Sequence, residues 1–170
     1  MFRKDELVRR AREYAQHHAL SLGEELGFGV HGIVLSAESQ IKTRGSSLHS
    51  AVKVHEREAC YLRERDIYLR LKERGIKEIR GCTVPKLIGY DDNLWIIEMS
   101  LVARPYVLDF AGAYLDWSPD FSEEVMADWR ADKQEQFGKQ WSEVLAILAC
   151  LESYGIYIED VSPSNISLGP

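Results

Sequence analysis

The pattern of hydrophobic and polar positions divides the first hundred residues into two helices and five short strands. Apolar residues at helical spacing mark the helices, and short apolar runs mark the strands. The predicted elements are a helix over 5–20, a hairpin of strands over 21–28 and 32–39, a strand over 50–54, a helix over 56–74, and strands over 84–90 and 93–99. Asp5 can cap the first helix, and Gly75 ends the second.

The pattern changes after Met99, where strands give way to an irregular stretch and then to helices. Residues 100–119 are predicted to be mostly irregular. The elements predicted beyond them are a helix over 121–132, an amphipathic helix over about 136–153, and a short strand over 156–158. Ser118 or Asp120 stands near the cap of the first of these helices. Residues 41–48 have the composition of an exposed loop.

Composition and charge exclude several classes of function. The chain has 170 residues, 45% of them hydrophobic and 28% charged, with a net charge of −6, so it can form one core. It has no basic block that would favour nucleic acid, no apolar run of membrane-spanning length, and a charged start unlike a signal peptide. Its three cysteines, Cys60, Cys82 and Cys150, have no metal-ligand spacing. They are expected to be reduced thiols of a cytoplasmic protein, in or near the core.

A glycine-rich segment at residues 27–34 is the first candidate for chemistry. It contains Gly27, Gly29, Gly32 and Val34 in the pattern G-x-G-x-x-G-x-V. Glycines at this spacing let backbone N–H groups approach a phosphate. Because the chain continues as a strand and not as a helix, the pattern favours a hairpin folded over phosphates. A glycine-rich hairpin without a ligand explains these glycines equally well.

The second candidate is a pair of opposite charges on apolar elements. Alternation along residues 50–54 places Ala51 and Lys53 on one face of the strand and Val52 and Val54 on the other. Glu64 lies within the apolar stripe of the 56–74 helix, where a carboxylate needs a cation or donors nearby. We therefore expect Glu64 to pair with Lys53. The alternatives are a lysine on an edge strand and a glutamate at the margin of the stripe, each reaching solvent.

The order of these motifs resembles the protein-kinase-like superfamily, from about residue 21 to the end of the sequence. The glycine segment matches the glycine-rich loop, and Lys53 and Glu64 match the A-x-K strand lysine and the helix glutamate. Residues 96–99 resemble the strand into the hinge, and Asp160 and Asn165 match the catalytic-loop motif D-x-x-x-x-N. The resemblance implies an α+β fold: a kinase N-lobe-like five-stranded antiparallel sheet with a C-helix over residues 21–100, preceded by an N-terminal helix over 1–20 and followed by a short, mostly helical partial C-lobe over 101–170.

The resemblance also implies roles for the matched residues. ATP would lie beneath the glycine loop, roofed by Val34 and Ala51, with Lys53 on its phosphates, fixed by Glu64. The adenine edge would meet the hinge backbone near Glu98 and Ser100. Asp160 would orient an acceptor hydroxyl or take its proton, and Asn165, with or without Asp160, would hold Mg²⁺. Without the upstream motifs, residues 160–165 are equally a proline-containing turn capped by its own polar side chains.

Departures from the family pattern leave two functional classes open. No D-F-G aspartate follows Asn165 in the 170 residues, so the Mg²⁺ site would be weak or absent. Ile158 and Glu159 stand where the family has His-Arg, and Ser162 stands where Ser/Thr kinases often have lysine. The chain is thus either a kinase-like phosphotransferase with a defective metal site or a pseudokinase that acts by binding a partner.

The apolar stripe of the 136–153 helix requires a cover. Trp141, Leu145 and Leu148 would otherwise form an exposed hydrophobic patch. The candidates are the N-terminal helix, the 121–132 helix, and a protein partner, including a second copy of the chain.

Overall fold

The structure is a computed structural model that describes residues 3–41, 49–102, 107–118, 120–159, 161–163 and 165–168. The chain divides into two compact units. The first comprises Met1–Leu69 and Pro85–Leu101, and the second comprises Arg70–Val84 and Val102–Pro170.

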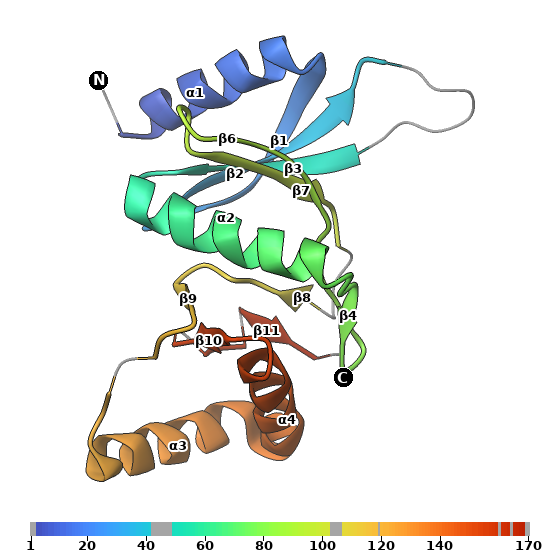
Figure 1. The fold of residues 1–170 in the computed structure, drawn as a ribbon. Coiled ribbons are helices and arrows are strands. Elements are labelled where there is room, and N and C mark those ends of the chain that lie inside the picture. Colours follow the sequence, from blue (N-terminus) through green and yellow to red (C-terminus); the bar gives the residue numbers. More distant parts are fainter. Residues whose placement is uncertain are drawn as a thin grey trace. The chain divides into compact units, whose positions relative to one another are not determined.

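The first unit contains a five-stranded antiparallel sheet (Figure 1). Its strands, in spatial order, are β1 (Leu20–Gly29), β2 (Gly32–Ser39), β3 (His49–His55), β7 (Ile96–Ser100) and β6 (Leu87–Asp91). The β1–β2 hairpin carries Gly29 opposite Gly32, with Val30 and His31 between them. The predicted α+β class with a five-stranded antiparallel sheet is therefore confirmed.

Two helices lie on opposite faces of this sheet (Figure 1). Helix α1 (Arg3–His17) buries Leu7, Ala11 and Tyr14, and these share one hydrophobic cluster with Val52 and Val54 of β3. Helix α2 (Glu58–Glu73) reaches the other face through Glu64, which contacts Lys53. The alternation predicted for the β3 strand is thus confirmed.

Helix α2 ends in a turn that contains Gly75. Gly75 has a φ of +66°, a left-handed conformation that glycine adopts without a Cβ clash. The amide of Gly75 donates to the carbonyl of Lys72, and the amide of Ile76 donates to that of Leu71. This pair of bonds is the Schellman arrangement, which satisfies carbonyls at the end of a helix.

The second unit combines short strands with two helices. Strands β4 (Glu78–Ile79), β5 (Cys82–Thr83), β8 (Val107–Leu108) and β11 (Ile166–Ser167) form one sheet, and β9 (Ala113–Leu115) pairs with β10 (Ile156–Ile158). All of these strands have only two or three residues. The described part of the 100–119 stretch is mostly irregular, as predicted, and it also contains β8 and β9, which are too short to show periodicity in the sequence.

The helices of the second unit differ from the predicted ones at their ends. Helix α3 runs over Glu123–Phe137, with Ser122 as its cap, since Ser122 Oγ accepts from the amide of Val125. The helix thus extends beyond the predicted end at residue 132, and its cap is Ser122, close to Asp120. A 3₁₀ turn, η1 (Gly138–Gln140), separates α3 from α4 (Trp141–Glu152). Gly138, with a φ of +53°, breaks the helical path, so the predicted 136–153 helix begins later.

Helix α3 covers part of the apolar stripe on α4. The ring of Trp141 packs against Trp129, with centroids 5.9 Å apart, and stacks on Phe137 at 6.0 Å. Leu148 is buried as well, whereas Leu145 remains 42% exposed. Of the candidate covers named from the sequence, the 121–132 helix therefore supplies one for Trp141, through Trp129.

The three cysteines lie in or near the core, as expected from the sequence. Cys60 and Cys82 are buried and Cys150 is partly buried, and all three are free thiols. Within the described ranges, no helix has both the length and the apolar character that crossing a membrane requires.

Candidate functional site

The predicted pairing of Lys53 with Glu64 is confirmed. Nζ of Lys53 on β3 lies 2.7 Å from Oε1 of Glu64 on α2. The two residues are only 6% and 3% exposed. Opposite charges buried together stabilise each other, whereas either charge alone would be costly in the core. The strand and the helix therefore bring a lysine ammonium and a carboxylate into fixed contact.

A histidine that was not predicted as a site residue completes this cluster. Nε2 of His55 lies 2.8 Å from Oε2 of Glu64, and the ring is 1% exposed. Nδ1 of the same ring lies 3.2 Å from the carbonyl oxygen of Trp95. Each oxygen of Glu64 thus has its own partner. Strand alternation could have indicated this histidine, because His55 lies two residues after Lys53 and so on the same face of an extended strand. It was missed because the predicted strand ended at Val54.

The two basic partners dominate the electrostatics of Glu64. Burial raises the pKa of Glu64, but Lys53 and His55 outweigh this and lower the pKa to about 2. A carboxylate accepting hydrogen bonds from cations is stabilised in its charged form. Glu64 is therefore ionised over the physiological pH range and fixes the position of Lys53.

Val34 and Ala51 share a face with Lys53. Val34 lies directly opposite Lys53 in the β2–β3 pairing, and directly opposite residues of an antiparallel pair point to the same side. Ala51 is two residues before Lys53 on β3, so it also lies on that face. Val34, Ala51 and Lys53 therefore lie on one face of the sheet, and Glu64 of α2 contacts this face through Lys53.

The glycines of the hairpin fall into two groups. Gly32 has a φ of +136°, and a Cβ there would overlap the carbonyl oxygen of Val54. Gly27 and Gly29 have negative φ values or extended backbone, and a Cβ at either would meet no atom within 4 Å. The fold itself thus requires glycine at position 32, and packing explains neither Gly27 nor Gly29.

The hairpin is anchored by the first turn of α1. Arg3 donates to the carbonyl oxygen of Gly29 at 2.8 Å and pairs with Glu56. Lys4 pairs with Glu25 at 2.6 Å, and both cations lie over the ring of Phe28, 5.7 and 5.2 Å from its centroid. These contacts connect the helix to β1 on both sides of Gly27.

Glu98 and Ser100 make their contacts inside the sheet unit. The carboxylate of Glu98 accepts from Ser50 Oγ at 2.7 Å and from the hydroxyl of Tyr14 at 3.0 Å. It therefore lies on the α1 face, away from the Lys53 face. The amide of Ser100 donates to the carbonyl of Lys86. The Ser100 N–H is thus already used within the sheet, and the Glu98 side chain joins a different buried cluster from Lys53.

The predicted metal residues lie in the second unit. Asp160 lies outside the described residues. The amides of Asn165 and Ile166 both donate to the carbonyl of Ser162, which holds Ser162 close to the start of β11. Among the residues that the structure describes, no group of three histidine, cysteine or acidic side chains could hold a metal ion. Asn165 supplies one amide oxygen, which alone suits Mg²⁺ poorly.

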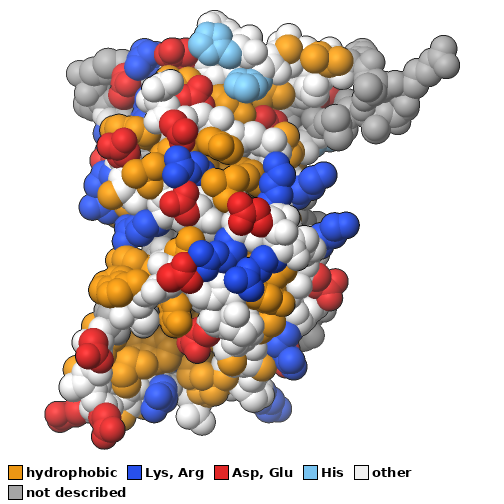
Figure 2. Space-filling view, viewed as in Figure 1, with side chains coloured by type: hydrophobic (Ala, Val, Ile, Leu, Met, Phe, Trp, Pro, Cys, Tyr) orange, Lys and Arg blue, Asp and Glu red, His pale blue; other side chains and the backbone are white. Residues whose placement is uncertain are grey.

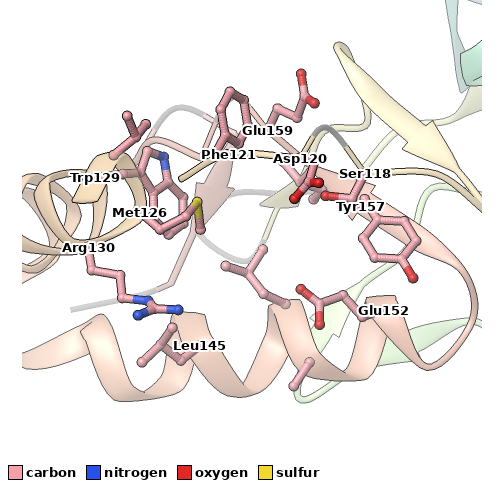
Figure 3. A pocket seen from close by; sticks show the side chains of 14 residues that line it. Ser118, Asp120, Phe121, Met126, Trp129, Arg130, Leu145, Glu152, Tyr157 and Glu159 are labelled. Atoms are coloured by element: carbon pink, nitrogen blue, oxygen red, sulfur yellow. The ribbon is translucent and has the colours of Figure 1, made fainter. Parts of the chain in front are cut away.

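A separate cavity of about 630 Å³ lies within the second unit, between α3, α4 and β10 (Figure 3). Its middle is apolar, with Met126, Trp129 and Leu145 among its lining residues. Glu152 and Asp120 line one side, and Arg130 lies at the other end (Figure 3). None of the residues predicted to bind ATP lines this cavity.

Hydrophobic side chains near this cavity also reach the surface. Figure 2 shows hydrophobic surface around α3, at the lower end of the view. Phe121 and Val125 are each 51% exposed, and Leu145 is 42% exposed. Exposed apolar groups that gather in this way mark a candidate surface for binding another molecule.

Comparisons with known proteins add no relative: no family model matches the chain, and no curated protein matches it.

Proposed function

We propose that the first unit binds ATP, as a kinase-like protein of the cytoplasm. The single observation that supports this most is the buried contact between Lys53 and Glu64 at 2.7 Å. A phosphate-binding lysine must be held in one place, and an ionised carboxylate beside it does so. The sheet and α2 would then correspond to a kinase N-lobe with its C-helix.

The glycine hairpin supports the same function. Gly27 and Gly29 have free space where a side chain would be, which is what a close approach of backbone amides to phosphate needs. Val34 and Ala51 lie on the Lys53 face, so they offer an apolar surface for the adenine. The hinge backbone near Glu98 and Ser100 would meet the adenine edge, although the Ser100 amide already donates within the sheet.

We propose phosphate transfer from ATP to a hydroxyl acceptor as the reaction. Asp160 would orient the hydroxyl or accept its proton, and Lys53 would stabilise charge on the phosphates. Mg²⁺, when bound, would neutralise phosphate charge. Asn165 and Asp160 are the residues offered for it, and they make a weak site without a further carboxylate.

Isothermal titration with ATP, with Mg²⁺ and with EDTA, tests the binding proposal. We expect saturable binding that is lost in Lys53→Met and kept in Lys86→Met, a control on an exposed lysine. Absence of binding by the wild-type protein under both conditions would overturn it. Transfer of radiolabel from γ-labelled ATP, compared with Asp160→Asn, then separates a catalyst from a pseudokinase.

The second candidate function is a protein-interaction module, a pseudokinase in the sense of the resemblance. The exposed Phe121, Val125 and Leu145 beside the cavity favour it. We propose that a second copy of the chain binds this surface. Light scattering coupled to size-exclusion chromatography tests this. A dimer that dissociates in Leu145→Glu supports it. A monomer at every concentration in the wild type excludes it.

A further inference from the structure

The ring of His55 faces two hydrogen-bond acceptors and no donor among the residues that the structure describes. Nε2 lies 2.8 Å from a carboxylate oxygen of Glu64, and Nδ1 lies 3.2 Å from the carbonyl oxygen of Trp95. A carbonyl oxygen and an ionised carboxylate can only accept. The Trp95 carbonyl also accepts from the backbone amide of His55, at 3.0 Å, which its two lone pairs allow.

A neutral imidazole cannot satisfy both contacts. It carries one N–H, so in either tautomer one ring nitrogen would present a lone pair to an oxygen. That arrangement is unfavourable in a site that is 1% exposed, where water cannot intervene. The imidazolium has two N–H donors and satisfies both oxygens at once.

We propose that His55 is an imidazolium at neutral pH and a positioning residue for Lys53, the second cation that keeps Glu64 ionised when the Lys53 ammonium turns to an anionic ligand. The charge state of His55 stands on the geometry alone, whereas its effect on ligand binding rests on the proposed ATP function.

Lys53 and His55 have different roles because each contacts a different carboxylate oxygen of Glu64. Lys53 uses Oε1 and His55 uses Oε2. If Lys53 shared its protons with a phosphate, a Glu64 that depended on Lys53 alone would become a poorly compensated buried charge, which is costly. With His55 on the other oxygen, Glu64 keeps a charge-assisted hydrogen bond. Lys53 can then bind phosphate without loss of its anchor.

Two further side chains lie close to His55, an aromatic ring and a second cation. The ring of Tyr61 on α2 meets it edge to face, with centroids 5.7 Å apart. Arg10 on α1 donates to the backbone carbonyl of His55 at 2.7 Å, and its guanidinium lies over the Trp95 ring. Arg10 thus binds the backbone and opposes the imidazolium charge, while the carboxylate of Glu64 contacts the ring directly.

Nitrogen-15 NMR of the ring measures the charge state. The chain has five histidines, so replacing His17, His18, His31 and His49 with glutamine leaves the signals of His55 alone. We expect both ring nitrogens to carry protons at pH 7. One unprotonated, pyridine-type nitrogen at pH 7 would overturn the proposal. This variant keeps His55, so the measurement does not depend on the folding of a His55 substitution.

Titration with ATP and with inorganic pyrophosphate measures the positioning role. In His55→Gln we expect affinity for both to fall about tenfold, the factor that corresponds to losing a charge-assisted hydrogen bond. When pyrophosphate binds to the wild-type protein, we also expect the carboxyl carbon-13 signal of Glu64 to remain that of an ionised group. In His55→Gln, we expect this signal not to remain so. Unchanged affinity in a folded His55→Gln would refute the positioning role. If neither protein binds either ligand, the ATP proposal fails, while the charge state is still decided by NMR.

Discussion

The hydroxyl of Tyr14 donates a hydrogen bond to Oε2 of Glu98 at 3.0 Å, on the face of the sheet that α1 covers. The other oxygen, Oε1, accepts from Ser50 Oγ at 2.7 Å. Glu98 is 6% exposed, so these two hydroxyls take the place of water around a buried carboxyl group. The sheet of the first unit therefore holds two buried acidic residues, Glu98 towards α1 and Glu64 towards α2.

Replacing Tyr14 with phenylalanine should destabilise the first unit. The substitution removes one donor from Glu98 and leaves a buried acceptor with an unmet hydrogen bond, which costs about 1–3 kcal/mol. Urea denaturation followed by circular dichroism measures this. Tyr90→Phe is the control, because Tyr90 is 41% exposed and should change stability little. Equal midpoints for the two variants would show that the Tyr14–Glu98 bond contributes nothing.

The cluster around Glu64 should respond unequally to loss of its members. Glu64→Gln leaves both Lys53 and His55 without their carboxylate, whereas Lys53→Met leaves Glu64 with His55. Breaking a buried pair by removing one partner costs about 3–5 kcal/mol. We expect Glu64→Gln to reach that range and Lys53→Met to fall below it.

A double-mutant cycle checks that these effects come from contact. The variant with both substitutions should be more stable than the sum of the two losses predicts, with a coupling of about 0.5–3 kcal/mol. Lys86→Met, on an exposed lysine, combined with Glu64→Gln should give simple additivity. A larger loss in Lys53→Met than in Glu64→Gln would contradict the role given to His55.

The sequence could predict this pair because both partners lie in short, regular patterns. Strand alternation fixed the face of Lys53, and the helical stripe of α2 placed a carboxylate inward. His55 was missed because the predicted strand ended one residue too early. The Tyr14–Glu98 contact joins residues 84 positions apart, and no periodicity within one element relates them.

The second unit was less predictable for a related physical reason. Strands of two residues, such as Glu78–Ile79 and Cys82–Thr83, are too short to show alternation in the sequence. They form because neighbouring strands pair with them. Helix α3 has almost equal polarity on all sides, so its end was set too early. By contrast, the break at Gly138 follows from a local property, the left-handed backbone that glycine tolerates.

The free energy of unfolding should decrease as the pH falls, because of Glu64. Its pKa is about 2 in the folded protein against an ordinary value of 4.5. The unfolded chain therefore binds a proton at Glu64 at higher pH than the folded protein does. The stabilisation is fully present above pH 4.5 and is lost as the pH falls from about 4.5 to about 2. The difference corresponds to roughly 3 kcal/mol.

Urea denaturation at intervals from pH 2 to pH 6 measures this dependence. Other carboxyl groups, among them Asp92 and Asp116, also have lowered pKa values, so the informative quantity is the difference between proteins. The free energy of unfolding should rise less steeply with pH in Glu64→Gln than in the wild type. Parallel curves for the two proteins would show that Glu64 does not supply the expected dependence.

The glycines of the hairpin should separate the requirements of folding from those of ligand binding. Gly32→Ala places a Cβ against the carbonyl oxygen of Val54 at a φ of +136°. Because the obstacle is backbone and the φ is unfavourable for alanine, the hairpin must distort, at a cost of about 1–3 kcal/mol. Thermal unfolding of the variant should show a clearly lowered midpoint.

Gly29→Ala should behave in the opposite way. A Cβ at Gly29 meets no atom within 4 Å, and the same holds at Gly27, so stability should change by less than about 1 kcal/mol. If backbone amides approach phosphate there, the added methyl group must weaken ATP binding in a protein that is otherwise intact. Titration of Gly29→Ala with ATP, beside its thermal midpoint, makes the comparison. A variant that is fully stable and binds ATP as tightly as the wild type would remove the glycine hairpin from the proposed site.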